Sequence, residues 1–218
     1  MARRNGQNAR GAANAKTIKP MSAEPSGIKT ATRRRLQEEL RKLSPADRAA
    51  QSSAICATLR SQPIWITSKT ILLFVPTREE PDISSLVSEA LGAGKLVAVP
   101  RHLPDVDQYI ACRVTDPHST LVTGRFGIPE PHPDSPIVLP NELDFALVPG
   151  IGFSLDGGRL GRGRGYFDRL LAAVPGFKCG VAFDCQIASD LLLEPHDICL
   201  DCILTPTRWH PTGCRSRS

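Results

Sequence analysis

A short stretch of the chain alternates glycine with arginine, in the order RLGRGRGYFD over residues 159–168. Glycine allows the backbone to adopt positive φ and to approach a ligand closely. Arginine provides a fixed fork of donors that matches phosphate and carboxylate oxygens. Asp168 adds a carboxylate that could hold Mg²⁺ against the same phosphates. These residue types predict a phosphate-binding loop with a magnesium ligand beside it.

The elements around this loop fit that chemistry. Phe145–Val148 is an apolar run that predicts a buried strand, and Pro149-Gly150 predicts the turn that ends it. Tyr166 begins a helical pattern that stops near Pro175. A strand, a glycine loop and a helix bring backbone N–H groups and a helix N-terminus toward a phosphate. The same composition also suits a flexible basic loop without a ligand, or one that grips a nucleic-acid backbone.

The common nucleotide-binding motifs are absent from the sequence. There is no G-x-x-x-x-G-K-[ST], and the glycines run G-x-G-x-G rather than G-x-G-x-x-G. A nucleotide would therefore bind in another class of site.

The loop resembles the signature of a known family. VPG at residues 148–150, Phe153, Asp156 and GRLGRGRGYFDR at residues 158–169 are similar to the pattern of 5-formyltetrahydrofolate cyclo-ligase, also called methenyltetrahydrofolate synthetase. The family pattern R-L-G-[RK]-G-[RK]-G-Y-[YF]-D is matched at every position, with Phe167 where Tyr is commoner. The resemblance covers about residues 29–207.

The resemblance implies an enzyme that converts 5-formyltetrahydrofolate to 5,10-methenyltetrahydrofolate and releases ADP and phosphate. Its substrates would be 5-formyltetrahydrofolate and ATP, its cofactor Mg²⁺, and its oligomeric state a monomer without nucleic-acid or membrane partners. A paralogue that binds nucleotide or folate without turnover is the alternative.

The resemblance also implies site residues. Nucleotide contacts are predicted for Lys29, Arg33, Arg159, Leu160, Gly161, Arg162, Gly163, Arg164, Gly165, Tyr166 and Phe167. Catalytic roles are predicted for Arg162, Arg164 and Tyr166, and Mg²⁺ ligands at Asp168 and Asp197. Substrate contacts are predicted for Val75, Glu80, Arg101 and Tyr166. Without the resemblance, the run Arg33–Arg35 would be an ordinary solvated helix face and Glu80 a solvated carboxylate.

Two further expectations concern the substrate. Arg101 follows the end of a predicted strand, which is where ligands approach open α/β sheets. The segment FGIPEP at residues 126–131 resembles a rigid loop of the family, which we expect near the pterin ring of the folate.

Hydrophobic periodicity predicts alternating helices and strands. Helices are expected from Lys29, at residues 44–61, 83–91 and 166–175, and from Gln186 through Leu192. Strands are expected at residues 70–75, 95–100, 109–114, 145–148, 179–183 and 199–204, with 109–114 antiparallel. This alternation predicts an α/β three-layer α/β/α sandwich with a mostly parallel sheet, of the NagB/RpiA/CoA-transferase-like kind.

Length and charge divide the chain into one domain and two tails. With 218 residues of which 41% are hydrophobic, we expect a single domain at residues 29–207, flanked by disordered tails at 1–28 and 208–218. Residues 1–35 hold nine of the 27 Lys and Arg but one of the 22 acidic residues, so the excess positive charge lies at the N-terminal end and the rest of the chain is slightly acidic. That tail suits a disordered segment, an organelle presequence, or an extension before a start at Met21. No apolar run is long enough to span a membrane, and we expect a cytoplasmic protein.

The seven cysteines are scattered and odd in number, which favours reduced thiols. Cys199-x-x-Cys202 lacks the second pair that a zinc site needs, so both are expected as buried strand residues. A nucleic-acid-binding protein is the competing function. Disordered RGG-type binders carry aromatic residues between their repeats, whereas here the basic tail has none and the glycine–arginine loop lies between a strand and a helix.

Overall fold

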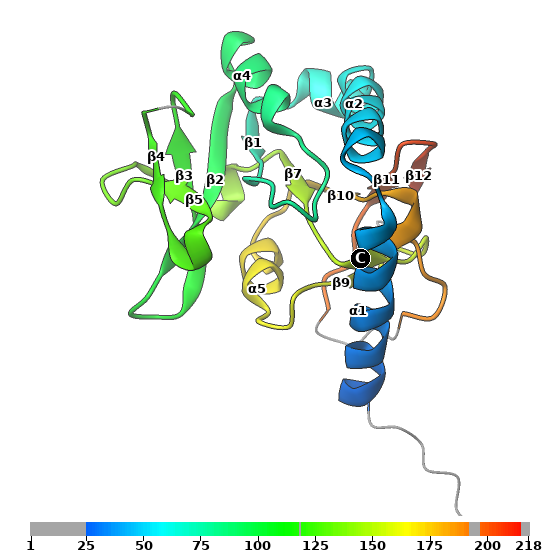
Figure 1. Ribbon diagram of the computed structural model, residues 1–218. Helices are drawn as coiled ribbons and strands as arrows, with labels where there is room; N and C mark the ends of the chain where they lie inside the picture. Colours follow the sequence, from blue (N-terminus) through cyan, green and yellow to red (C-terminus); the bar gives the residue numbers. More distant parts are fainter. Residues whose placement is uncertain (1–24, 118, 192–196, 215–218) are drawn as a thin grey trace, which may run out of the picture.

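The computed structural model describes residues 25–117, 119–191 and 197–214, and its centre is an eight-stranded sheet (Figure 1). The strand order is β12-β11-β10-β7-β1-β2-β3-β6. The five strands from β11 to β2 are parallel, and β12, β3 and β6 add antiparallel pairings at the two edges. Their bounds are β1 Thr70–Leu72, β2 Leu96–Leu103, β3 Gln108–Val114, β6 Ile137–Val138, β7 Phe145–Val148, β10 Phe177–Val181, β11 Cys202–Leu204 and β12 Trp209–Pro211.

Helices cover both faces of this sheet, because successive strand residues point to opposite sides. Phe145 and Leu147 pack with α2 (Pro45–Arg60), α3 (Pro63–Thr67) and α4 (Ser84–Gly92). Ala146 and Val148 pack with α5 (Tyr166–Ala172) on the opposite face. Figure 1 shows α2, α3 and α4 together on one side and α5 on the other. The prediction of a three-layer α/β/α sandwich with a mostly parallel sheet is confirmed.

The first helix, α1 (Pro25–Lys42), begins four residues before the expected Lys29, so residues 25–28 belong to the folded domain. Residues 1–24, the rest of the expected tail, lie outside the described residues. Leu36 and Leu40 of α1 are buried. Ser44 caps α2, because its hydroxyl accepts the Asp47 N–H at 3.1 Å and Pro45 occupies the first helical position.

The smaller elements lie in the loops between sheet strands. Two short antiparallel pairs form outside the main sheet, β4 (Leu121–Thr123) with β5 (Pro129–Pro131) and β8 (Gly152–Phe153) with β9 (Arg159–Leu160). The pair β8–β9 lies within the segment expected as a continuous glycine loop. Three 3₁₀ turns complete the described elements: η1 Arg125–Gly127, η2 Pro140–Glu142 and η3 Asp184–Gln186.

The helix expected from Gln186 is wrong in its described part. Gln186 ends the turn η3, and its buried amide is used as a bridge between loops. Its Oε1 accepts the Phe183 N–H at 2.8 Å, and its Nε2 donates to the carbonyls of Gly150 and Ile151 at 2.8 and 3.1 Å. Gln186 thus pairs the Phe183 N–H and the Gly150 and Ile151 carbonyls, and it ends a turn instead of starting a helix. Leu192 lies outside the described residues.

The expected disordered tail from residue 208 is also wrong as far as Cys214. Trp209–Pro211 forms β12, which pairs antiparallel with β11, and the Trp209 ring stacks on Phe177 at 6.1 Å. Cys202 is buried in a strand as predicted, but Cys199 is exposed and lies before the strand. Cys199 forms a disulfide with Cys214, with 6.2 Å between their Cα atoms, so the expectation of reduced thiols fails for this pair.

In the part of the chain that the structure describes, no helix has both the length and the apolar character to cross a bilayer.

Candidate active site

A cavity of about 810 Å³ opens at the carboxyl ends of β1 and β7, where the chain turns out of the sheet. The residues after β1 (Phe74 and Val75) and after β7 (Pro149 and Gly150) line it. Ligands of open α/β sheets bind at this edge. One side of the cavity is formed by the glycine–arginine loop and α1, and the other by β2, β3 and the segment before β6. The two sides differ sharply in chemistry.

Positive φ angles shape the glycine–arginine loop. Gly163 has φ +92° and Gly165, the residue before α5, has φ +66°. Both values are unfavourable for residues with a Cβ. Arg33 of α1 fixes the loop from outside, because its Nε donates to the Gly161 carbonyl at 2.9 Å. The loop is therefore held open by glycine and anchored to the first helix.

Arg159 and Asp168 form a partly buried ion pair beneath this loop. The guanidinium Nη2 lies 2.5 Å from Asp168 Oδ1, and the Arg159 side chain is 4% exposed. Its Nη1 donates to the Pro149 carbonyl at 3.4 Å, and its guanidinium carbon lies 5.9 Å from the centre of the Phe167 ring. Among the described residues, Nε of Arg159 is buried and has no hydrogen-bond partner. An unpaired buried donor beside the cavity is the kind of group that an anionic ligand would satisfy.

A second ion pair closes the cavity where α1 meets the chain before β11. Lys29 Nζ lies 2.9 Å from Asp197 Oδ2, and both side chains line the cavity. The structure thus brings the predicted nucleotide contact Lys29 together with the predicted metal ligand Asp197, although 168 positions separate them.

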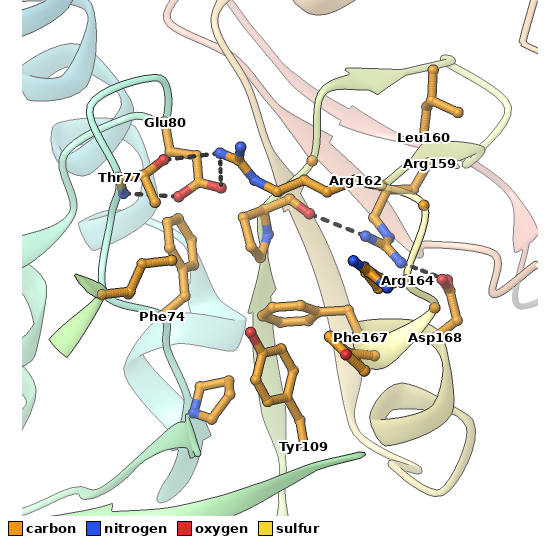
Figure 2. A pocket seen from close by; sticks show the side chains of 18 of the residues that line it. Phe74, Thr77, Glu80, Tyr109, Arg159, Leu160, Arg162, Arg164, Phe167 and Asp168 are labelled. Carbon is orange, nitrogen blue, oxygen red and sulfur yellow. Dashed lines mark hydrogen bonds and ion pairs between the residues drawn. The ribbon is translucent and has the colours of Figure 1, made fainter. Parts of the chain in front are cut away.

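A third contact crosses the cavity from the loop to the segment after β1. Arg162 Nη2 donates to Thr77 Oγ1 at 3.0 Å and to Glu80 Oε1 at 3.3 Å (Figure 2). Glu80 also accepts the Thr77 N–H at 2.9 Å, which holds its carboxylate in the segment after β1. Arg164 lines the same side, and in the described part of the chain its guanidinium forms no hydrogen bond or ion pair. It is the loop arginine most available to a ligand.

The opposite side of the cavity is aromatic and apolar. The Tyr109 ring lies 5.0 Å from that of Tyr166 and 5.8 Å from that of Phe167. Burial raises the pKa of Tyr109, which keeps its hydroxyl neutral. Apolar lining is added by Phe74, Val75, Val99, Pro100, Ile128 and Pro129. Flat heteroaromatic rings bind in surroundings of this kind.

Glu130 places one carboxylate in this apolar part. It is buried, lines the cavity, and accepts the backbone N–H of His102 at 3.1 Å. Glu130, Pro129 and Ile128 belong to the segment 126–131, so the structure places that segment beside the cavity, as the sequence suggested.

The hydroxyl of Tyr166 is bound by a group of polar side chains outside the lining. It donates to Asp107 at 2.7 Å and accepts from Arg125 at 2.9 Å. The hydrogen bond from Tyr166, followed by those from Arg125 and His102, holds the pKa of Asp107 well below its usual range. The same hydrogen bond to Asp107 raises the pKa of Tyr166. Both groups therefore keep their ordinary charge states, carboxylate and neutral phenol, at neutral pH.

All of the predicted site residues except Arg101 line this one cavity. The expectation for Arg101 is wrong, because β2 continues to Leu103 and Arg101 lies within the strand rather than after its end. Its guanidinium donates to the carbonyls of His132 and Pro133, at 3.2 and 2.5 Å. Leu160 lines the cavity, while its side chain packs with Leu36, Ile151 and Ala188. Its contact with a nucleotide would come from the backbone.

The sequence did not reveal several residues of the site. Phe74, Thr77 and Tyr109 line the cavity without having been assigned contacts, and His102, Asp107 and Arg125 contact Tyr166 from outside the lining. No motif marks them. The alternation in β3 was the available signal for Tyr109, because it shares a strand face with the buried Ala111.

Asp168 and Asp197 contribute hard oxygen donors to the cavity, and the described residues contain no group of three metal-ligating side chains. A dedicated zinc or calcium site needs more protein ligands than this. Mg²⁺ retains waters and binds through one or two carboxylates together with phosphate oxygens. The donor set therefore fits Mg²⁺ that arrives with a nucleotide.

Comparison with known proteins gives a consistent result. The family model for 5-formyltetrahydrofolate cyclo-ligase matches residues 25–206. The 5-formyltetrahydrofolate cyclo-ligase of Escherichia coli K12 is 30% identical over 177 residues, covering 79% of this chain and 97% of that protein. The protein of the same name from Mycolicibacterium smegmatis is 30% identical over 190 residues, covering 83% and 94%.

Solved structures show the same relationship. The 5,10-methenyltetrahydrofolate synthetase of Aquifex aeolicus superposes with a TM-score of 0.77 at 34% identity, covering 85% of this chain and 93% of that one. The synthetase of Mycoplasma pneumoniae gives a TM-score of 0.67 at 25% identity, covering 82% and 98%.

Proposed function

Because the chain belongs to the 5-formyltetrahydrofolate cyclo-ligase family, we propose that it converts 5-formyltetrahydrofolate to 5,10-methenyltetrahydrofolate with ATP, releasing ADP and phosphate. The observation that supports this activity most strongly is the division of the cavity. Its arginine–glycine side suits a triphosphate, and its aromatic side suits the flat pterin ring of a folate. A reaction between ATP and a folate needs both in one cavity.

The chemistry proceeds through a phosphorylated formyl group. The formyl oxygen would leave as hydroxide, which is a poor leaving group, so it first attacks the γ-phosphorus of ATP and displaces ADP. N10 of the folate then attacks the formyl carbon, loses its proton, and closes the ring. The C–O bond breaks with its electron pair on oxygen, and phosphate departs. Such a transfer depends on positioning and charge neutralisation rather than on a nucleophilic side chain.

The loop arginines would supply that neutralisation. Arg164 has a guanidinium without a described partner, and Arg159 has a buried Nε without one, so both can donate to phosphate oxygens without first losing an internal hydrogen bond. To bind a phosphate, Arg162 must either break its hydrogen bonds to Thr77 and Glu80 or keep them and use its other N–H groups. Lys29 and Arg33 add positive charge from α1.

Asp168 and Asp197 would hold Mg²⁺, which would offset the negative charge of the phosphates. Each carboxylate now faces a cation, Arg159 or Lys29. The prediction of a magnesium requirement follows from these donors.

The folate would occupy the aromatic side. Tyr109, Tyr166 and Phe167 offer ring faces and edges to the pterin, while Glu80 and Val75 lie at the junction with the arginine side. Tyr166 belongs to both sides, as the first residue of α5 after the loop and as part of the aromatic group. The formyl group would therefore meet the γ-phosphate near Tyr166.

The absorbance band of methenyltetrahydrofolate tests this proposal. Purified protein with Mg·ATP and 5-formyltetrahydrofolate should produce an ATP-dependent rise, and Arg162→Ala and Asp168→Ala should each lower its rate by roughly a hundredfold or more. Arg78→Ala is the matched control, because Arg78 is exposed in the same segment as Glu80 and does not line the cavity.

Absence of the rise in folded wild-type protein would overturn the proposed activity. A binding-only paralogue would then remain, and it would still bind ATP or 5-formyltetrahydrofolate in calorimetry.

A further inference from the structure

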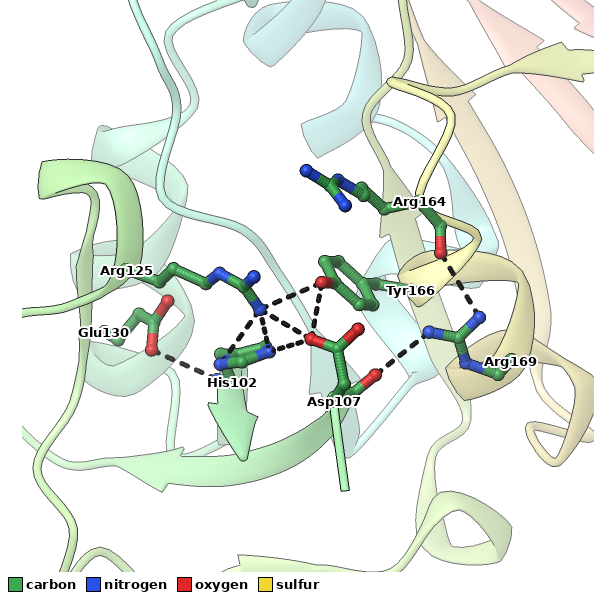
Figure 3. Close-up of polar contacts among 7 residues, drawn as sticks. All are labelled: His102, Asp107, Arg125, Glu130, Arg164, Tyr166 and Arg169. Carbon is green, nitrogen blue, oxygen red and sulfur yellow. Dashed lines mark hydrogen bonds and ion pairs between the residues drawn. The ribbon is translucent and has the colours of Figure 1, made fainter. Parts of the chain in front are cut away.

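The Tyr166 hydroxyl is surrounded by side chains that the reaction itself does not require. Asp107 Oδ1 accepts from Tyr166 Oη at 2.7 Å and from Arg125 Nη1 at 2.7 Å, and lies 2.9 Å from His102 Nε2 (Figure 3). Arg125 Nη1 also contacts the Tyr166 hydroxyl and the ring of His102. We name His102, Asp107 and Arg125 the tyrosine clamp. None of its three members lines the cavity.

The tyrosine clamp and Tyr166 come from separate segments of the chain. Asp107 lies in the turn between β2 and β3, Arg125 begins η1, and Tyr166 begins α5. Asp107 is the one described residue other than glycine with positive φ, at +48°. Aspartate tolerates this conformation better than most residues, yet a strained backbone persists only where its surroundings require it. Here the turn aims the carboxylate at Tyr166.

The clamp also fixes the plane of the Tyr166 ring. The guanidinium carbons of Arg125 and Arg169 lie 5.6 and 5.2 Å from the ring centre, and the His102 ring lies 5.4 Å from it. Arg169 further donates to the Asp107 carbonyl at 3.1 Å and to the Arg164 carbonyl at 3.2 Å. Arg169 therefore connects the β2–β3 turn to the backbone of the glycine–arginine loop.

These hydrogen bonds limit what the Tyr166 hydroxyl can do. A phenolic hydroxyl has one proton to donate, and Asp107 accepts it. One acceptor position is taken by Arg125. The proton is thus not free for the formyl oxygen, and Tyr166 presents its ring and its remaining acceptor capacity to a ligand.

The tyrosine clamp contributes little to the stability of the fold. The Asp107 and Arg125 side chains are 59% and 32% exposed, and ion pairs at such exposure contribute little to stability. The clamp acts on a buried tyrosine at the wall of the cavity, so its main effect falls on the shape of that wall.

We propose that Asp107 is a positioning residue for the folate: through the Tyr166 hydroxyl and Arg125 it fixes the ring against which the pterin packs. This inference rests on the proposed function of the cavity and deepens it. The Asp107 side chain contacts no arginine of residues 159–168, so its loss should affect the folate more than the nucleotide.

The test compares Asp107→Ala with Asp105→Ala in the methenyl absorbance assay. Asp105 is an exposed aspartate of the same turn without a described side-chain partner, so its replacement removes the same charge from the same place. Asp107→Ala should raise KM for 5-formyltetrahydrofolate roughly tenfold while KM for ATP stays within about twofold, the range that loss of a charged hydrogen bond supports. Asp105→Ala should change neither. Asp107→Asn keeps an acceptor oxygen and should recover part of the loss.

A double-mutant cycle shows whether Asp107 acts through Tyr166. If it does, Tyr166→Phe combined with Asp107→Ala should be no worse than Tyr166→Phe alone. Additive losses, an equal rise in KM for ATP, or no difference from Asp105→Ala would each overturn the inference. Should wild-type protein show no turnover, the proposed activity fails separately. The inference is then decided by calorimetry, which must show weaker 5-formyltetrahydrofolate binding to Asp107→Ala than to wild type.

Discussion

The two sides of the cavity are built in different ways. On the arginine–glycine side, most of the ligand-facing groups come from one stretch of chain, residues 159–168, with additions from α1 and Asp197. On the aromatic side, the groups come from the ends of β1 and β2, from β3, from the segment around η1 and β5, and from α5. A phosphate can be bound by one loop because backbone and arginine donors surround it, whereas a flat ring needs walls from several directions.

The sides also differ in how their polar groups are satisfied before a ligand binds. Among the described residues, the guanidinium of Arg164 and the Nε of Arg159 on the arginine–glycine side have no hydrogen-bond partner. Around Tyr166, by contrast, Asp107 accepts a hydrogen bond from the hydroxyl and Arg125 donates one to it. The arginine–glycine side therefore has donors available for an anion, whereas the aromatic side is held in shape before a ligand binds.

Replacement of Arg159 should produce the largest loss of stability and of turnover. Arg159→Met leaves the Asp168 carboxylate without its cation in a mostly enclosed place, which should lower the free energy of unfolding by roughly 3 kcal/mol and nearly abolish turnover. Urea unfolding followed by fluorescence, together with the methenyl assay, measures both. The charge-neutral pair Arg159→Met with Asp168→Asn should recover stability but not activity. Recovery of activity in the double variant would contradict a role for either charge in the reaction.

The pH dependence of stability should reveal the contribution of the tyrosine clamp. The folded state lowers the pKa of Asp107 below its unfolded value of about 3.9, so the carboxylate stabilises the fold above that pH. The stabilisation is lost as pH falls through the folded pKa. Wild type and Asp107→Asn should therefore differ slightly in Tm at pH 6, because the contact is mostly exposed, and converge as pH falls below about 4. A Tm difference that grows toward acid pH would reverse the sign and contradict the contact.

The smallest effect is expected at a surface pair of similar chemistry. Arg60 and Glu89 also form a close arginine–carboxylate contact, at 2.6 Å, but their side chains are 41% and 40% exposed. The Arg60 hydrogen bond lowers the pKa of Glu89, yet solvent screens the pair. Glu89→Gln should cost less than about 1 kcal/mol in urea unfolding and leave turnover unchanged. A loss as large as that of Arg159→Met would show that burial is not what distinguishes the two pairs.

The sequence predicted the arginine–glycine side far better than the aromatic side, and the reason is physical. A contiguous loop leaves a contiguous pattern, so the phosphate chemistry could be inferred from residues 159–168, and the layers of the fold followed from hydrophobic periodicity. Asp107, Arg125 and Tyr166 meet only after β2, β3 and α5 have packed, and no local spacing encodes that meeting. The C-terminal strand was missed for a similar reason, since Trp209 gains its place by pairing with β11 and stacking on Phe177.

Separate binding of the two ligands tests the division of the cavity most directly. We would measure the affinities of a non-hydrolysable ATP analogue with Mg²⁺ and of 5-formyltetrahydrofolate by calorimetry, for wild type, Arg164→Ala and Tyr109→Ala. Arg164→Ala should weaken the nucleotide roughly tenfold and spare the folate, and Tyr109→Ala should do the reverse. If both variants weakened both ligands equally, or each weakened the other ligand, the assignment of phosphate and pterin to opposite sides would be wrong.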